Sequence, residues 1–558
     1  MNPFLATDGY KTGHHMMYPK ETVTVYSNFT PRSNKYGPKG ARKVVVFGPQ
    51  MVMRQIYDMF DKEFFKKDKA EVCGEIKREY SMYLGTNYNV EHIAALHDLG
   101  YLPITVKSLP EGTLAPIGVP VLTIYNTKHE FFWLTNFLET LLSTLLWKPM
   151  TSATIARLYR SNLTKWAKMT DEDNIPFVSF QGHNFSMRGM DGLSSAINAS
   201  LGHATSFLGD DTLSTIYAAR KFYDAEGPVV HSVNATEHSV MCAGSKDDEI
   251  GTFRYLMEQF PTGILSIVSD TWDLWKVCTE YIVTLKDEIL ARDGKIVIRP
   301  DSGNPVDIIC GDAIEITKLE HNSTGRAYPP NADQLESWDK TYRKDGKYYK
   351  LVGEATGKEW KEVEPTPANI GVIELLWNVF GGKKNEQGYR ILDSHIGAIY
   401  GDSITIDRAE HICQRLEKKG FASTNVVLGI GSFTYQFNTR DTFGFAMKAT
   451  YVELKETTDE IIPVLINEDE GGLGEAPATY KVIGREIFKD PITDDGTKKS
   501  AKGLLRVVED DDGNYILEDQ TDWEGEKDSA LQTIFTNGQF ENVVTFNTIR
   551  ERIAKSLV

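Results

Sequence analysis

With 558 residues, the chain is longer than one ordinary hydrophobic core supports, so we expect two domains. Its 61 Lys and Arg residues against 78 Asp and Glu residues give a formal net charge of −17, which argues against general affinity for nucleic acid or anionic membranes. The five cysteines form no Cys-x-x-Cys pair, so the sequence suggests neither a zinc site nor a disulfide framework.

The sequence shows no targeting or membrane-spanning pattern. Residues 1–10 lack the basic region and the apolar core of a signal peptide. The most apolar stretch, residues 131–147, is interrupted by Asn136 and Glu139, which is typical of a packed amphipathic helix rather than a membrane span. We therefore expect a cytoplasmic protein with no membrane partner and no nucleic-acid partner.

The two ends of the chain share a strand-rich pattern. Apolar, β-branched runs predict strands at residues 23–27, 44–47, 104–107 and 121–125, with helices near 51–65 and 131–146. Beyond residue 441 the pattern is again β-rich, and Asp512-Gly513 joins two strands as a hairpin. We expect residues 1–172 and 441–558 to form one α+β domain with a mainly antiparallel sheet.

Residues 173–440 repeat a different unit, in which an apolar strand runs into a polar loop and then a helical segment. The clearest copy is the stretch from Lys295 to Pro305, and residues 265–270, 396–403 and 425–432 end in the same way. This repetition predicts an α/β fold with an irregular β/α barrel, in which chemistry gathers at the C-terminal ends of the strands. An insertion at about 320–366, with a hairpin signal at Asp345-Gly346, interrupts the series.

Several polar residues near these loops can have either a structural or a functional role. Arg188 either holds an anion or, more commonly for an arginine, pairs with a carboxylate. A helix cap does not need both Asp210 and Asp211, so one carboxylate can be free for a ligand. His238 is more often a structural histidine, and Asp270 either caps a helix or binds magnesium or a hydroxyl group.

One group of loop residues is suited to a phosphate. Gly431 and Ser432 directly follow an apolar strand, and backbone N–H groups there can cradle a phosphate without an obstructing Cβ atom at the glycine. Arg440, close by in sequence, adds a charge that can bind phosphate through two parallel hydrogen bonds. A short Gly-x-Gly motif by itself is weak support for such a site.

A second group is suited to a sugar and a larger anion. Asp301 and Asp402 follow their strands and can accept hydrogen bonds from vicinal hydroxyl groups, as a ribose offers. Arg188, His238 and Arg299 can neutralise a second anion. Together with the phosphate site, these features describe a phosphorylated ribose that carries a diphosphate.

The order of these motifs resembles the nicotinamide phosphoribosyltransferase family, over nearly the whole chain. The match includes the specific Arg-Pro-Asp-Ser-Gly-Asn-Pro block at residues 299–305. The other matching segments are Tyr10-Lys11, Phe185-x-x-Arg188-Gly189, Asp211-Thr212, Glu237-His238-Ser239, Val268-Ser269-Asp270, Gly401-Asp402, Gly429-x-Gly431, Arg440-Asp441 and Lys489-Asp490-Pro491. The resemblance implies a type II phosphoribosyltransferase fold and a homodimer with active sites at the subunit interface.

The same resemblance implies the reaction and the roles of individual residues. Nicotinamide and phosphoribosyl pyrophosphate would give nicotinamide mononucleotide and diphosphate in NAD salvage, with Mg²⁺ and with coupled ATP hydrolysis. His238, Asp301, Arg299 and Asp270 would form the catalytic group, and His238 would be transiently phosphorylated. Phe185 and, from the partner subunit, Tyr10 would contact the pyridine ring, and Asp211 would contact the carboxamide. Arg188 would bind the diphosphate, Gly401 and Asp402 the ribose, and Gly431, Ser432 and Arg440 the 5′-phosphate. Lys448, Lys489 and Lys498 of the other chain would reach ATP or pyrophosphate.

The preference among pyridines follows from charge. The Asp211 carboxylate favours an amide, which donates a hydrogen bond, over nicotinate, which brings a second negative charge. Two alternatives stay open: a nicotinate phosphoribosyltransferase on the same fold, or a nucleotide-binding regulator without turnover. The chain also departs from the family pattern, because Ser432 and Phe433 follow Gly431 where the family has glycine, and Ser403 follows Gly401-Asp402 where the family has glycine.

Overall fold

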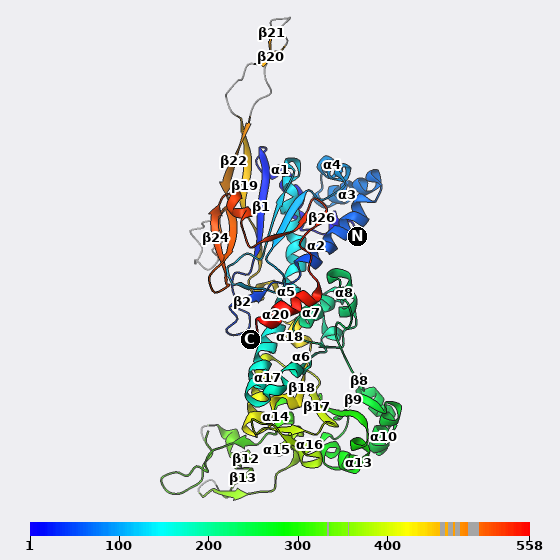
Figure 1. Ribbon diagram of the computed structural model, residues 1–558, viewed down its shortest axis with the longest axis vertical. Helices are drawn as coiled ribbons and strands as arrows, with labels where there is room; N and C mark the ends of the chain where they lie inside the picture. The colour runs from blue at the N-terminus through cyan, green and yellow to red at the C-terminus, as the bar shows by residue number, and fades with distance from the viewer. Residues whose placement is uncertain are drawn as a thin grey trace.

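Two large sheets organise the molecule, one antiparallel and one parallel (Figure 1). The computed structural model describes residues 1–331, 334–354, 357–457, 464–466, 472–474, 480–488 and 501–557. Within those residues, each of the two sheets has seven strands. The predicted α/β class and the irregular parallel barrel are confirmed.

Both ends of the chain contribute to the antiparallel sheet. Its order is β22-β19-β1-β5-β3-β25-β26. These strands are β1 (Thr22–Thr30), β3 (Ile104–Ser108), β5 (Leu122–Asn126), β19 (Ala446–Thr457), β22 (Tyr480–Glu486), β25 (Gln532–Thr536) and β26 (Gln539–Phe540). In this sheet β1 pairs with β19, which places Asn28 opposite Lys448.

The helix α5 (Phe132–Thr170) connects this sheet to the rest of the molecule and differs from the prediction. The sequence predicted a helix near residues 131–146. Pro149 lies just beyond this range, and proline disfavours continuation of a helix because it lacks an N–H group and crowds the preceding turn. The helix instead continues through Pro149, whose ring packs so closely on Gly48 that a Cβ atom there would lie 2.9 Å from it. Lys148 Nζ donates a 2.5 Å hydrogen bond to the Tyr435 carbonyl, so this part of α5 is anchored on both sides.

The parallel sheet has the order β7-β6-β18-β17-β10-β9-β8. Its strands are β6 (Gly182–Asn184), β7 (Gly209–Asp210), β8 (Asn234–Ala235), β9 (Thr262–Val268), β10 (Asp293–Arg299), β17 (Ile396–Tyr400) and β18 (Val426–Ile430). The segment around β8 joins the two edges, because His231 pairs with Gly209 while Asn234 pairs with Leu265. The sheet thereby curls into a barrel.

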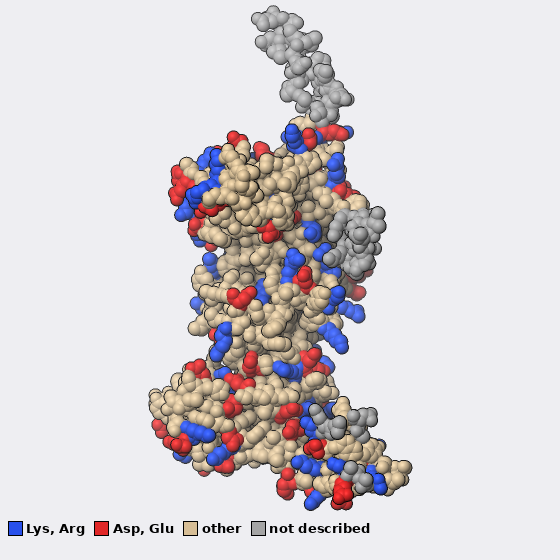
Figure 2. All heavy atoms as spheres, turned by 180° about the vertical axis from the view of Figure 1, so that it is seen from behind, with Lys and Arg blue, Asp and Glu red and all other residues tan. Residues whose placement is uncertain are grey.

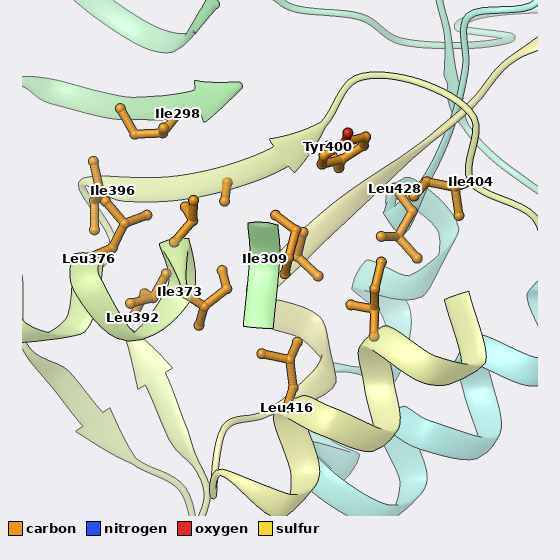
Figure 3. Packing of buried hydrophobic residues seen from close by; sticks show 14 of the residues in the cluster. Ile298, Ile309, Ile373, Leu376, Leu392, Ile396, Tyr400, Ile404, Leu416 and Leu428 are labelled. Carbon is orange, nitrogen blue, oxygen red and sulfur yellow. The ribbon is translucent and has the colours of Figure 1, made fainter. Parts of the chain in front are cut away.

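Alternation along β10 decides which side chains face the barrel interior. Ile296 and Ile298 are fully buried against the surrounding helices α14 (Pro305–Cys310), α16 (Val372–Phe380) and α17 (Ile406–Lys418), as Figure 3 illustrates for Ile298 with Ile309, Leu376 and Leu416. Lys295, Val297 and Arg299 line the interior cavity. Because successive side chains of a strand point to opposite faces, this pattern delivers Arg299 to the inner mouth of the barrel.

The remaining elements surround these two sheets. The helices are α1 (His14–Met17), α2 (Pro49–Phe60), α3 (Lys69–Leu84), α4 (Glu91–Leu99), α6 (Val178–Gln181), α7 (Leu193–Ala204), α8 (Ser214–Tyr223), α9 (His238–Ala243), α10 (Glu249–Gln259), α11 (Leu274–Lys276), α12 (Ile282–Thr284), α13 (Lys286–Leu290), α15 (Pro367–Ile370), α18 (Ser432–Gln436), α19 (Trp523–Lys527) and α20 (Phe546–Lys555). The smaller strand pairs are β2 (Lys43–Val45) with β4 (Leu114–Pro116), β15 (Gly382–Lys384) with β16 (Arg390–Leu392), and β20 (Val464–Ile466) with β21 (Gly472–Gly474).

The two predicted hairpins are present. In the insertion, β12 (Tyr342–Lys344) and β13 (Lys347–Val352) flank Asp345-Gly346 and form a small sheet with β11 (Ile314–Glu315) and β14 (Glu359–Glu362). Near the C-terminus, β23 (Leu504–Glu509) and β24 (Tyr515–Thr521) pair across Asp512-Gly513.

The surface carries both signs of charge. On the face that Figure 2 shows, acidic and basic side chains are interspersed rather than gathered by sign. An anionic ligand is therefore held by local cations rather than by a broad basic field. Among the described helices, none is long and apolar enough to cross a membrane.

Candidate active site

Four polar residues from three neighbouring strand ends meet at one end of the barrel. Arg299, at the end of β10, donates a 3.2 Å hydrogen bond to Asp301 Oδ2 and another of 3.2 Å to the Thr236 carbonyl after β8. His238 Nε2 lies 3.9 Å from both Asp270 Oδ1 and Asp301 Oδ2. Asp270, after β9, accepts the backbone N–H of Asp301 at 2.8 Å. The sequence predicted this convergence, since C-terminal ends of parallel strands meet at one edge.

Three polar atoms of this cluster are buried without a hydrogen-bond partner among the described residues: Asp270 Oδ1, Asp301 Oδ1 and Arg299 Nε. Buried polar groups are nearly always paired, so unpaired ones at a loop cluster indicate a ligand-binding role. His238 itself is half exposed, and its Nδ1 lies 3.0 Å from Thr271 Oγ1. The cluster therefore offers two acceptors, one donor and an oriented imidazole to a ligand.

Glycines bring the other loops close to this cluster. A Cβ atom at Gly401 would collide with Asp301 Oδ1 and would lie 2.9 Å from Arg299 Nε. A Cβ atom at Gly431 would collide with Asp402 Oδ1. The same holds for Gly189 against the hydroxyl of Ser432. The loops after β6, β10, β17 and β18 thus form one continuous site, and glycine is needed where they approach most closely.

A cavity of about 650 Å³ extends from this cluster through the barrel. At the cluster end it is lined by Phe185, Asp211 and Arg299. The Arg299 guanidinium lies over the Phe185 ring at 5.4 Å, and the His183 ring lies 4.5 Å from the Phe185 ring. Flat aromatic walls beside a carboxylate suit a small aromatic amide.

Two donors hold the Asp211 carboxylate in place. His183 Nε2 lies 2.9 Å from Asp211 Oδ1, and the Ser232 hydroxyl donates to the same oxygen. Partial burial opposes ionisation, yet these hydrogen bonds and the charge of Arg299 keep the pKa of Asp211 below its usual value. Its neighbour Asp210 is buried and accepts from Asn184, Thr212 and Thr215. Asp210 is therefore a buried, fully bonded carboxylate, whereas Asp211 faces the cavity.

The other predicted site residues lie in several parts of the molecule. Arg188 is exposed in a short turn, Met187–Gly189, that packs on α18. Tyr10 is 65% exposed in the turn Gly9–Gly13 that leads into α1, where its ring contacts His14. Arg440 pairs with Asp441 at 3.5 Å, and Lys448 is exposed on β19. Lys489 and Lys498 lie outside the described residues.

Sequence reasoning missed five residues that the structure places at these sites. His183, Ser232 and Thr271 orient predicted site residues. Ser266 lines the cavity, and its hydroxyl is buried without a partner in the described part of the chain. The Arg32 N–H donates to the Phe443 carbonyl at 3.1 Å, in the segment that follows Arg440, and burial together with the charge of Arg440 lowers the pKa of Arg32. Strand alternation could have found Ser266, because it lies on β9 at an even spacing of four residues before Asp270, which follows the strand.

Comparison with known proteins identifies the family. Residues 180–463 match the model of the "Nicotinate phosphoribosyltransferase (NAPRTase) family". Over 569 aligned residues, the chain is 44% identical to the nicotinamide phosphoribosyltransferase of Acinetobacter baylyi, covering 100% of the chain and 98% of that relative. The chain belongs to the nicotinate phosphoribosyltransferase family. The resemblance inferred from the motifs is thereby confirmed.

Further members of this family extend the comparison. A nicotinamide phosphoribosyltransferase of Mycoplasma pneumoniae is 31% identical over 495 residues, 86% of the chain and 97% of the relative. One of Xanthomonas campestris pv. campestris is 28% identical over 557 residues, 98% of the chain and 97% of the relative. Among solved structures, human Nicotinic Acid Phosphoribosyltransferase aligns with 99% of the chain and 93% of its own length, at 14% identity and a TM-score of 0.49.

Proposed function

We propose that this family member is a nicotinamide phosphoribosyltransferase, which forms nicotinamide mononucleotide and diphosphate from nicotinamide and phosphoribosyl pyrophosphate in NAD salvage. The observation that carries the proposal is the cluster of Arg299, Asp301, His238 and Asp270 at the mouth of a cavity that holds Asp211. Several relatives named nicotinamide phosphoribosyltransferase, one of them 44% identical over the full chain, support the same reaction.

Departure of diphosphate from C1 of the sugar leaves an oxocarbenium-like ribose, so the enzyme must neutralise the leaving group and align the pyridine nitrogen. Arg299 and His238 face the leaving diphosphate in this scheme, and Asp301 and Asp402 accept the ribose hydroxyl groups. Phe185 presents its ring beside the cavity and thereby orients the pyridine. No nucleophile from the protein is needed at the sugar.

The carboxamide is recognised through Asp211. Its Oδ1 already accepts from His183 and Ser232, so the other oxygen is available to accept the amide N–H of nicotinamide. Nicotinate would instead place a carboxylate against this oxygen, at a cost in electrostatic energy. The lowered pKa of Asp211 keeps the residue ionised under neutral conditions.

Magnesium fits the same cluster as a cofactor shared with the substrate. Asp270 Oδ1 and Asp301 Oδ1 are buried acceptors that lack a donor among the described residues. In the described ranges, no group of three or more His, Cys, Asp or Glu side chains is arranged to hold a metal ion. Proteins commonly bind Mg²⁺ through one or two carboxylates together with substrate phosphates, and a bound ion would neutralise the diphosphate.

We also propose that ATP hydrolysis is coupled to turnover through His238. Thr271 fixes Nδ1 of the imidazole, which leaves Nε2 facing the two carboxylates at 3.9 Å. The test is to measure ATP hydrolysis with and without nicotinamide and phosphoribosyl pyrophosphate. Both substrates together should stimulate hydrolysis in the wild type but not in His238→Ala. Stimulation that survives this substitution would contradict the role of His238.

The active enzyme is proposed to be a homodimer in which Tyr10 of the partner subunit covers the pyridine. Within one chain Tyr10 is exposed, and its ring lies beside His14 and Lys11 of its own segment. A complementation assay tests this arrangement, because Tyr10→Ala and Arg299→Ala would impair different sites. Mixed and re-associated chains should regain about one quarter of the wild-type sites, since half the dimers carry one intact site. No recovery above the separate variants would contradict sharing of the site.

The reaction itself is tested by release of pyrophosphate from phosphoribosyl pyrophosphate when nicotinamide is added, with nicotinamide mononucleotide as the second product. Equal additions of nicotinamide and nicotinate separate the two phosphoribosyltransferases, because the proposal expects nicotinamide to be consumed first. Binding of nucleotide without pyrophosphate release would instead identify a regulator. Arg299→Ala serves as the control for background hydrolysis. The expected cytoplasmic location stays a prediction from the sequence.

A further inference from the structure

The loop Gly401-Asp402-Ser403 carries the Asp402 carboxylate next to a residue with an unusual backbone conformation. Ser403 has a φ angle of +56°, in the left-handed region that favours glycine. A residue with a Cβ atom loses roughly 1–2 kcal/mol in that conformation, and such residues cluster at functional sites where surrounding contacts hold them. Ser403 therefore carries a backbone strain that the contacts around it must offset.

Contacts on both sides fix the loop except at Ser403 itself. Before it, the Gly401 N–H donates to the Pro300 carbonyl at 3.0 Å. After it, the Ile404 N–H donates to the Gly429 carbonyl at 3.3 Å. Between these anchors Asp402 is exposed at the mouth of the barrel, with its carboxylate packed against Gly431. The direction of that carboxylate therefore depends on the conformation of Ser403.

Arg408 supplies the missing contact. Its Nη1 donates to the Ser403 carbonyl at 2.5 Å and to the Ser403 hydroxyl at 3.0 Å. The guanidinium comes from the first turn of α17, which Thr405 caps by accepting the backbone N–H of Arg408. Charge-assisted hydrogen bonds from a capped helix are strong enough to offset strain of this size.

We propose that Arg408 is a positioning residue for the phosphoribosyl substrate, which keeps Ser403 in its left-handed conformation and so aims Asp402 at the ribose. The inference rests on the proposed function, because it uses Asp402 as the acceptor for ribose hydroxyl groups. The tether and the strain are linked, because Arg408 bonds both the carbonyl and the hydroxyl of the residue that has the positive φ angle.

The proposal predicts a coupling between two substitutions. Arg408→Ala frees the loop, so the competent conformation falls to roughly one tenth of the population and the KM for phosphoribosyl pyrophosphate rises about tenfold. Ser403→Gly removes the need for the tether, so adding Arg408→Ala in that background should raise this KM less than about threefold. The kcat and the KM for nicotinamide, measured at saturating phosphoribosyl pyrophosphate, should change little in either case.

Arg415→Ala is the matched control, because Arg415 lies on the same helix and donates to Asp307 at 2.7 Å and to the Gly311 carbonyl at 3.0 Å, away from the loop. It should leave the KM for phosphoribosyl pyrophosphate unchanged. A purely structural role for Arg408 would lower the amount of active enzyme, and hence kcat, without raising this KM.

The outcomes separate the possible failures. An equal rise in KM in both backgrounds would overturn the tether and indicate that Arg408 binds the substrate directly. A fall in kcat alone would overturn it in favour of general stabilisation. If the wild-type enzyme released no pyrophosphate at all, the proposed function would fail, and the role assigned to Arg408 with it.

Discussion

Replacing Asp211 by asparagine tests the basis of pyridine selection. The substitution keeps the shape of the side chain but removes its negative charge, which lies at the cavity beside Phe185 and Arg299. Asparagine can still accept from nicotinamide, and it can also donate to the carboxylate of nicotinate. We therefore expect the preference for nicotinamide to shrink.

The size of the effect follows from the geometry. Two unit charges about 4 Å apart repel by about 4 kcal/mol at the effective dielectric constant of about 20 that suits sites near a protein surface. The Asp211 side chain is 42% exposed, and its Oδ1 already accepts from two donors, so solvent and these donors reduce the repulsion. About 1–2 kcal/mol remains, which corresponds to a change of about 5–30-fold in the selectivity ratio.

The assay is competition between nicotinamide and nicotinate in one reaction, read as the ratio of the two kcat/KM values. Asp224→Asn is the matched control, because Asp224 is an exposed aspartate at the opposite end of α8 that pairs with Arg54. It makes the same charge change away from the cavity and should leave the ratio unaltered. An unchanged ratio in Asp211→Asn would refute the role of Asp211 in choosing the amide.

Three further predictions concern groups around this site and the stability of the fold. His183→Phe removes a donor that partly neutralises the Asp211 carboxylate, so it should raise the preference for nicotinamide over nicotinate. His183→Gln keeps a donor and should stay near the wild-type ratio; equal ratios for the two variants in the competition assay would contradict this. Burial raises the pKa of Glu111 to about 7 from 4.5, so between these two pH values the carboxyl is protonated in the folded state and ionised in the unfolded state. The free energy of unfolding should therefore fall by up to about 3 kcal/mol as the pH rises from about 4.5 to about 7. Denaturant titration of Glu111→Gln should show no such dependence on pH. Lys11 and Glu139 form a buried ion pair at 2.5 Å, so Lys11→Met should lower the free energy of unfolding by about 3–5 kcal/mol. Adding Glu139→Gln to Lys11→Met should recover most of this loss. If the losses of the two single variants simply added, the result would argue against a stabilising pair.

The parallel barrel was predictable because each of its main strands is an apolar run, typical of a buried strand, that is followed directly by polar or glycine residues. In β10, three apolar residues lead directly to Arg299, and the same pattern recurs at β9, β17 and β18. Parallel strands align their C-terminal ends, so sequence order alone gave the convergence of Arg299 with Asp270 and Gly401. The two hairpins were also predictable from the sequence, because Asp-Gly dipeptides favour tight turns.

The supporting residues could not be predicted for the opposite reason. His183 and Ser232 are ordinary polar residues in sequence, and they matter only because a curled sheet brings both to one carboxylate oxygen. The full length of α5 was also hidden, since Pro149 locally argues for a helix end while packing on Gly48 argues for continuation. In each case tertiary contacts outweigh the local pattern.

The pairing of β1 with β19 links residues more than 400 positions apart in sequence. During synthesis β1 therefore leaves the ribosome long before its neighbour β19 exists, while the barrel strands between them in sequence can already assemble with one another. Because such long-range closure is slow, the antiparallel sheet is expected to be the last large element to form. A ribosome-stalled chain that ends before β19 should then expose one edge of β1, which makes that nascent intermediate a natural client of chaperones.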